Sequence, residues 1–259
     1  MIVSLKKNFT NGGQAKTFGP FTAPKYSLKF DSTYENFGRV AIPEADQLFT
    51  TGDFSFSYWW KAPSPGFINF FHWQQSDVGT GFESIESAIH SSLGYIRHRF
   101  TDSVGGTVLT SNVNVCDDDW HHIVCSCDRD GDFEMWIDGS MNVSASSGCT
   151  GDMSIDATQT NAIYLFGVNV AYTSWEDGQI DQVAIFNSAL PSGSIAILYN
   201  SGTPLTNWPL TIAYPQALWE LDEGSGLLSE GLGSNAQDMT LHTNNVSYLL
   251  FFLNPLINL

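Results

Sequence analysis

Two acidic residues three apart, Glu83 and Glu86, are the nearest approach of this sequence to a catalytic carboxylate pair. Glycoside hydrolysis needs two carboxyl groups facing one bond, one as the acid and one as the nucleophile or base. Residues three apart on a strand point to opposite faces. The sequence also lacks the G-x-S-x-G, H-E-x-x-H and P-loop motifs. We therefore expect a protein without catalytic residues.

Three consecutive carboxylates, Asp117, Asp118 and Asp119, are the best candidates for binding a hard cation. Calcium takes several oxygen ligands, which loops often supply. The alternative is a solvated acidic turn. Calcium is the one cofactor that the sequence suggests.

Aromatic residues beside polar ones occur at two places where strands are expected to end. The residues are Trp73 with Gln74, and Tyr172 with Trp175 and Asp177. Ring faces combined with polar loop groups are suited to sugar recognition. Anchoring of the core or of a subunit interface would explain the same aromatic residues.

Composition excludes several classes of protein and of partner. The chain has 259 residues and a formal net charge of −17, with only 10 Lys and Arg, but with 18 Phe, 9 Tyr and 8 Trp. So many aromatic residues exclude a disordered chain, and so few cations disfavour nucleic acid as a partner. The longest apolar run, 248–253, is too short to insert into a membrane. The N-terminus lacks the apolar stretch of a signal peptide.

Alternating apolar and polar residues predict many short strands, as at 54–60, 133–137 and 180–186. Gly with Asp or Asn marks the turns between them, as at 138–139. This pattern favours an all-β sandwich or jelly roll. One short helix is expected at 192–200, with Ser192 as its cap. Four cysteines fall within 116–149, and we expect buried thiols rather than disulfides.

Five motifs in order over residues 26–200 resemble the LamG-like branch of the concanavalin A-like lectin/glucanase superfamily. They are Y-S-L-K-F-D with V-A-I-P, F-S-F-S-Y-W-W, W-H-H-I-V, F-E-M-W-I-D-G and G-Q-I-D-Q-V-A-I-F. The resemblance implies an all-β fold of two antiparallel sheets, a concanavalin A-like jelly roll, with one short helix. The motif residues are expected to be structural; they are Phe30, Asp31, Trp120, His122, Trp136, Asp138, Gly139 and Asp181.

The sequence divides into an N-terminal arm (1–22), the jelly roll (23–204) and a C-terminal segment (205–259). In the last of these, Trp219 to Gly226 resembles the strand with which such domains usually begin. The segment is therefore expected either to complete this chain's own sandwich or to dock on a neighbouring subunit.

LamG-like domains with this appended end resemble structural proteins of tailed phages. The expected function is that of a non-catalytic virion protein, such as a head decoration, fibre or tail adhesin. It would bind other virion proteins or copies of itself as a homo-oligomer, and could bind a cell-surface glycan. The expected location is the virion, outside the cell after release. The alternative is an extracellular bacterial carbohydrate-binding module or adhesin, and a glucanase-like hydrolase is disfavoured.

Overall fold

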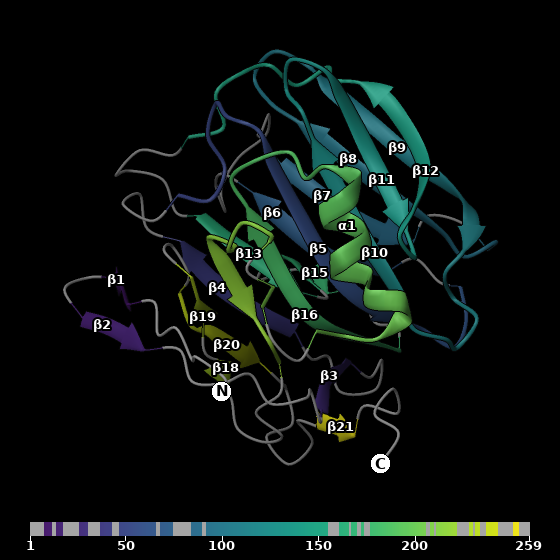
Figure 1. The fold of residues 1–259 in the computed structure, drawn as a ribbon. Helices are drawn as coiled ribbons and strands as arrows, with labels where there is room; N and C mark the ends of the chain where they lie inside the picture. The colour runs from purple at the N-terminus through teal and green to yellow at the C-terminus, as the bar shows by residue number, and fades with distance from the viewer. Residues whose placement is uncertain are drawn as a thin grey trace.

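Antiparallel strands make up most of the secondary structure in the computed structural model. The structure describes residues 8–11, 14–17, 26–30, 37–42, 47–65, 68–74, 84–89, 92–154, 161–165, 167–169, 172–173, 177–205, 208–209, 211–221, 228–229, 231–233, 237–242 and 251–253. The chain folds into two large sheets and two small two-stranded sheets (Figure 1). This confirms the all-β sandwich predicted from the alternation.

The first large sheet has nine strands. Seven run in the order β12–β11–β10–β5–β16–β17–β19, while β3 also pairs with β16, and β21 pairs with β3. Their bounds are β3 (Tyr26–Phe30), β5 (Phe54–Lys61), β10 (His121–Cys127), β11 (Asp132–Ile137), β12 (Ser140–Ser146), β16 (Gly178–Phe186), β17 (Ala217–Trp219), β19 (Gly231–Leu232) and β21 (Phe251–Leu253).

The second large sheet has eight strands in the order β18–β20–β4–β13–β6–β7–β8–β9. Their bounds are β4 (Phe37–Ile42), β6 (Ile68–Gln74), β7 (Ser84–Ile89), β8 (Tyr95–Thr101), β9 (Gly106–Asn114), β13 (Asn161–Leu165), β18 (Leu228–Ser229) and β20 (Met239–His242). The small sheets pair β1 (Asn8–Asn11) with β2 (Gln14–Thr17), and β14 (Gly167–Asn169) with β15 (Tyr172–Thr173).

The main core lies between the two large sheets. Alternate residues of β5, Phe54, Phe56, Tyr58 and Trp60, belong to it and are buried completely or nearly so. Because side chains alternate across a strand, the residues between them point to the other face of the sheet. Trp59, one of these, is also buried, so the nine-stranded sheet is covered on both sides.

Helix α1 (Ser192–Tyr199) lies across that other face (Figure 1). Its Ile195 and Leu198 join a second apolar cluster with Val124 of β10, Ala184 of β16 and Leu218 of β17. The predicted helix is confirmed, and Asn200 ends it in the left-handed conformation. The predicted cap is wrong. Pro191 occupies the N-cap, and no side chain caps the helix, because Ser192 is already its first residue.

The described strands of the C-terminal segment lie in both large sheets of the same chain. β17 pairs with β16, and β20 pairs with β4. Trp219 is fully buried in the main core, and its indole Nε1 donates to the carbonyl of Gln237 at 2.8 Å. These strands therefore complete the chain's own sandwich.

Within the described residues, no helix is long and apolar enough to cross a membrane.

Replacing Trp219 should show how far the sandwich depends on its last strands. Trp219→Ala removes a fully buried ring and should lower the free energy of unfolding by about 3–5 kcal/mol. Trp219→Phe keeps most of the apolar volume and should cost less. Urea denaturation of both variants, with Met141→Ala at an exposed position of β12 as control, measures the difference. Equal stability of Trp219→Ala and Met141→Ala would contradict this role.

Candidate functional site

A histidine held between two aspartates joins the start of β10 to the turn after β11. The His121 Nδ1 lies 2.7 Å from Oδ2 of Asp138, and its Nε2 lies 3.1 Å from Oδ1 of Asp117. Oδ1 of Asp138 also accepts the backbone N–H of His122 at 2.9 Å. Burial alone would lower the pKa of His121, but the two carboxylates raise it above its usual value. The imidazole thus links two loops through its two ring nitrogens.

The turn at Asp138 and Gly139 has positive φ at both residues, 51° and 73°, as a tight hairpin turn requires. A Cβ at Gly139 would lie 2.7 Å from Cδ1 of Tyr199 in α1. Glycine therefore allows the helix to contact the hairpin. His122 points to this side and lies among Trp59 and Tyr199, with ring centres 5.0 and 6.2 Å away. His122, Asp138 and Gly139 thus lie where the hairpin contacts the helix.

The predicted calcium ligands do not come together. Asp117 accepts from His121 and from the backbone N–H of Asp119, while Asp118 pairs with Lys61 at 3.3 Å. The described part of the chain contains no group of three or more His, Cys, Asp or Glu that could hold a metal ion. Two of the three carboxylates are thus directed to different partners, Asp117 to His121 and Asp118 to Lys61, and the calcium role stays a prediction.

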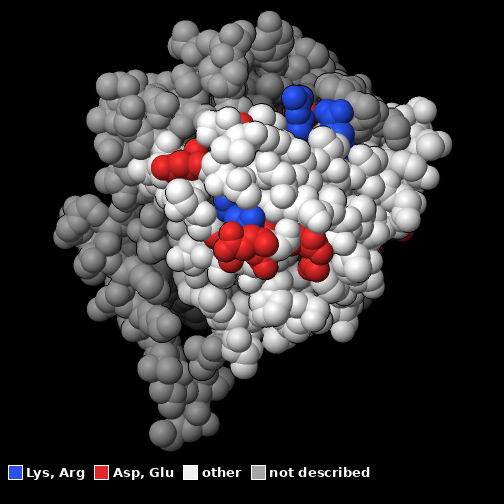
Figure 2. All heavy atoms as spheres, turned by 90° about the horizontal axis from the view of Figure 1, so that it is seen from above, with Lys and Arg blue, Asp and Glu red and all other residues white. Residues whose placement is uncertain are grey.

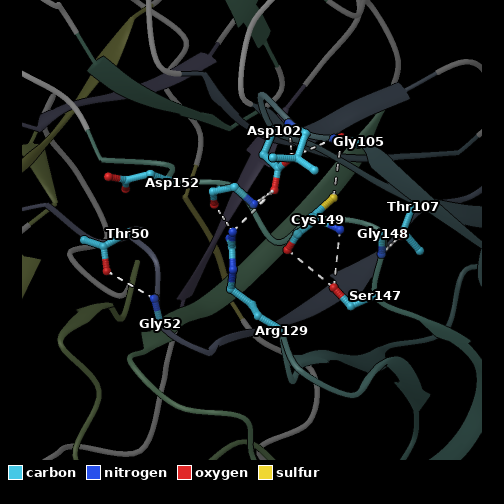
Figure 3. Close-up of polar contacts among 12 residues, drawn as sticks. Thr50, Gly52, Asp102, Gly105, Thr107, Arg129, Ser147, Gly148, Cys149 and Asp152 are labelled. Carbon is cyan, nitrogen blue, oxygen red and sulfur yellow. Dashed lines mark hydrogen bonds and ion pairs between the residues drawn. The ribbon is translucent and has the colours of Figure 1, made fainter.

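A buried ion pair locks three loops at one end of the sandwich (Figure 3). Oδ2 of Asp102, after β8, lies 3.3 Å from the Arg129 guanidinium, which also donates to the carbonyl of Gly151. The same carboxylate accepts from the backbone N–H of Gly151 at 2.6 Å, and its other oxygen accepts from Val104 and Gly105. Arg129 is only 3% exposed. This cluster is closed to ligands, so its role is structural.

All four cysteines are buried free thiols, as predicted. The Sγ atoms of Cys125 and Cys127 lie 3.8 Å apart in β10. Burial raises the pKa of Cys116 to about 11 and also raises those of Cys127 and Cys149. A thiol is nucleophilic only as the thiolate, so these three cysteines are not prepared for covalent chemistry.

An open groove of about 520 Å³ lies between the β10–β11 hairpin and the start of α1. Its lining includes Asp128, Asp132 and Glu134. Glu134 accepts from the indole of Trp136 at 2.9 Å, and Asp128 accepts from the backbone N–H of Asp130. The groove is acidic, but two of its three carboxylates already have partners.

The outer face of the eight-stranded sheet carries arginine side chains, unlike the acidic groove. The register aligns one residue from each of six neighbouring strands in a row, which is Arg39, Tyr164, His72, Glu86, Arg99 and Val108. Phe100, the residue after Arg99, points to the opposite side of the sheet and belongs to the main core. Because successive side chains alternate, Arg99 points away from the core. Arg97, two residues earlier, shares that face.

The arginines of this face have different partners. Arg97 lies 3.0 Å from Glu86, while Nε of Arg97 is buried without a hydrogen-bond partner. Arg99 is exposed and makes no ion pair or hydrogen bond through its side chain to any described residue. Arg39 lies over the ring of Tyr164 and donates to its hydroxyl at 3.4 Å. We call Arg39, Arg97 and Arg99 the arginine face.

Figure 2 shows one face of the molecule, on which the described Lys, Arg, Asp and Glu residues form a few small groups. The arginine face holds three of the ten cationic residues of a chain whose net charge is −17. Sequence reasoning missed it, because Arg39 lies almost 60 residues before the other two. The spacing of Arg97 and Arg99 on one strand face was the available signal.

The residues predicted to bind a ligand are not shown to form one site. In the register, Trp73 lies opposite Ile85 and Ile163, both fully buried in the main core, and Gln74 lies opposite Ser84 and Ala162. Tyr172 is in β15 and Asp177 is exposed just before β16. Trp175 lies outside the described residues, as does Glu83. Their ligand role stays a prediction.

The other predicted structural residues have varied positions. Asp181 is fully buried in β16, and its carboxylate accepts the N–H of Gln182 at 2.9 Å. Trp136 is in β11 and packs against the second apolar cluster. Trp120 directly precedes β10 and is partly exposed. Phe30 pairs with Gly178, and Asp31 lies outside the described residues.

The sequence matches the family model of the concanavalin A-like lectin/glucanases superfamily over residues 35–196, more than half of the chain. The chain belongs to this superfamily. The match covers the described strands from β4 to β16 and most of α1, including the arginine face. None of the curated proteins matches the chain.

Solved structures show the same superfamily fold at low sequence identity. A putative carbohydrate binding protein from Bacteroides ovatus has a TM-score of 0.59 and 12% identity, over 90% of this chain and 64% of that one. A heptameric SAP-like pentraxin from Limulus polyphemus has a TM-score of 0.54 and 11% identity, over 86% and 97%. The Ruminococcus gnavus IT-sialidase CBM40, bound to alpha2,3 sialyllactose, has 0.51 and 10%, over 68% and 97%.

Removing the buried Asp102–Arg129 ion pair should lower the stability of the fold. Asp102→Ala leaves Arg129 as an uncompensated buried charge and should destabilise the fold by about 3–5 kcal/mol. Asp118→Ala, at the solvent-exposed pair with Lys61, should cost about 0–1 kcal/mol. Chemical denaturation of both variants tests this contrast. A similar loss of unfolding free energy in the two variants would show that Asp102 does not hold the loops together.

Two buried histidines should make the protein sensitive to acid. Burial lowers the pKa of His98 to about 3 and that of His122 to about 4. The unfolded chain therefore binds more protons below pH 6.5, so each histidine reduces stability as the pH falls. Each should contribute roughly 2 kcal/mol of loss between pH 7 and pH 5. Urea denaturation across this range measures the loss, and His98→Gln should lessen it.

His121 supplies a control of opposite sign. Its raised pKa gives a stabilising contribution that is complete below pH 6.5 and is lost as the pH rises through its folded-state pKa. His121→Gln should therefore make the loss of stability on acidification steeper. If both substitutions changed the pH slope in the same direction, the assigned pKa shifts would be wrong.

Proposed function

We propose that this chain is a non-catalytic binding protein of the particle surface, a structural protein of a tailed-phage virion such as a head decoration, fibre or tail adhesin. The single observation that carries the binding role is the state of the described titratable side chains. Two buried histidines have lowered pKa values, three cysteines have raised ones, and Asp102 is paired with Arg129. Glu86, the nearest to a hydrolase carboxylate, is paired with Arg97.

The solved relatives support a binding role through their fold. One is a putative carbohydrate binding protein, and another is a sialidase's CBM40 bound to a sialylated sugar. We extend glycan binding to this chain as part of the proposal, with the β8–β9 end of the eight-stranded sheet, where Arg99 and Val108 are exposed, as the binding surface. The opposite sheet is not available for this purpose near β5 and β10, since α1 covers it there.

The C-terminal segment supports the proposed role as a virion protein. Trp219 to Gly226 resembles the appended end of phage structural proteins, and its described strands pair within the same chain. A sandwich closed by its own strands leaves its faces for contacts with other proteins. We propose that these are other virion proteins or copies of this chain, in a homo-oligomer. The pentraxin relative shows that the fold occurs in a heptamer.

Mass spectrometry of purified phage particles tests this function. The chain should be present at a fixed copy number in particles purified from a lysate of the host that carries its gene. Light scattering of the isolated chain should give a mass of at least twice 28.5 kDa. Absence from the particles, together with a secreted form in the culture medium, would overturn the virion role and favour the extracellular binding module.

A further inference from the structure

The segment that carries helix α1 is tied to the nine-stranded sheet only at its two ends. Before the helix, the backbone of Leu190 bonds to serine hydroxyls of β5 and β10, at 3.0 Å each. After it, the side-chain amide of Gln182 bonds to the backbone of Leu205 at 2.8 and 3.2 Å. Between these anchors, residues 191–204 make no hydrogen bond or ion pair to any described residue of the sheet. We call residues 191–204 the lid.

The contacts that remain between the anchors are few. Ile195 and Leu198 are the buried residues of the helix, and no side chain caps its N-terminus. A helix of this length is marginal by itself. After it, Asn200 and Ser201 both have positive φ, 46° and 57°, which is unfavourable for residues other than glycine. Residues 182–219 contain no charged residue and no histidine, so no ion pair can fasten the lid.

A small cavity lies between the lid and the sheet. It has a volume of about 20 Å³, and its lining includes Leu198 of the lid with Trp59 and His122 of the sheet. Side chains that border a cavity have fewer dispersion contacts than side chains in a close-packed interior. The lid therefore covers this part of the sheet without packing closely against it.

His122 is a titratable group directly under the lid. Its ring lies between Trp59 of β5 and Tyr199 of α1, at an angle of 25° to the ring of Tyr199. The residue is only 3% exposed, and its Nδ1 is buried without a hydrogen-bond partner. A proton taken up here would place a charge and an N–H without an acceptor in an apolar environment. Burial accordingly lowers the pKa of His122 to about 4.

One charged group near His122 favours its protonated form. This is Asp138 in the turn after β11, whose effect on the pKa is smaller than that of burial. The Asp138 carboxylate is already bonded to the ring of His121 and to the backbone N–H of His122. The lid contributes the hydroxyl of Tyr199, whose pKa is raised by burial, so it is neutral between pH 5 and pH 7.

The other charged groups on this face of the sheet are separated from His122. In the register, Trp59 lies opposite His122 on one side and opposite Asp181 on the other, so its ring stands between them. Lys61 shares the face of Trp59, and it is paired with Asp118 at 3.3 Å. A protonated His122 thus gains little from its surroundings while the lid is closed.

We propose that the lid is a pH-sensitive switch, which swings away from the nine-stranded sheet about Leu190 and Leu205 when His122 takes up a proton. Opening brings water to the imidazolium, and it exposes the apolar cluster under the helix, to which Val124 and Leu218 belong. At neutral pH the uncharged ring packs against Tyr199, and the lid is closed. This switch goes beyond the proposed function and does not depend on it.

Hydrogen exchange of the full chain, followed by NMR at pH 7 and pH 5, tests the switch. A histidine with a pKa of about 4 when covered and 6.5 when exposed favours opening about 20-fold more at pH 5. The protection of amides 195–200, corrected for the intrinsic exchange rate, should fall by that factor. It should also be lower than the protection of β8 at both pH values. Equal protection of α1 and β8 would show that the helix opens only when the whole fold does, and would overturn the proposal.

Matched variants assign the effect to one histidine. His122→Gln takes up no proton, so the protection of amides 195–200 should change less than about twofold between the two pH values. His98→Gln removes the buried histidine of the main core, which lies against Phe56, and should keep the fall of about 20-fold. His122→Phe repeats the test with a ring between Trp59 and Tyr199, should the smaller side chain prevent folding. A fall as large in the His122 variants as in the unaltered chain would overturn the role of His122.

Discussion

The nine-stranded sheet must be covered on both faces, and much of the remaining structure follows from that constraint. Every residue of β10 is buried, and β5 is buried from Phe54 to Trp60. Strands with apolar or aromatic residues on both sides would expose a large apolar area if either cover were removed. The eight-stranded sheet covers one face, and α1 with Leu190, Leu205 and Ile212 covers the other.

Several of the family motifs lie where helix α1 covers the nine-stranded sheet. His122 faces α1, while its neighbour His121 is fastened to Asp138. Gly139 leaves room for Tyr199, which comes from the helix. The motif W-H-H and the motif D-G therefore form one joint between the sheet and the helix. A binding role for these residues would compete with this joint.

The local pattern of the sequence was enough to predict the strands and the position of the helix. Alternation at 54–60 and the Asp138–Gly139 turn depend only on neighbouring residues, and both are found as predicted. Contacts between distant residues could not be predicted in this way. Arg129 and Asp102 are 27 residues apart, and their pairing depends on how three loops meet. The arginine face likewise depends on the register of β4, β13, β6, β7 and β8, which no single segment encodes.

The pairing of the C-terminal strands also has a consequence for synthesis. β16 can pair with β17 only after β17 has been synthesised. β4 can pair with β20 only after β20, about 200 residues later in the chain, has been synthesised. A nascent chain therefore leaves the ribosome with unpaired strand edges until its last strands emerge. Such distant pairings slow folding and expose edges that other chains can join. Production of this protein should accordingly depend on temperature and on chaperones more than its ordinary size suggests.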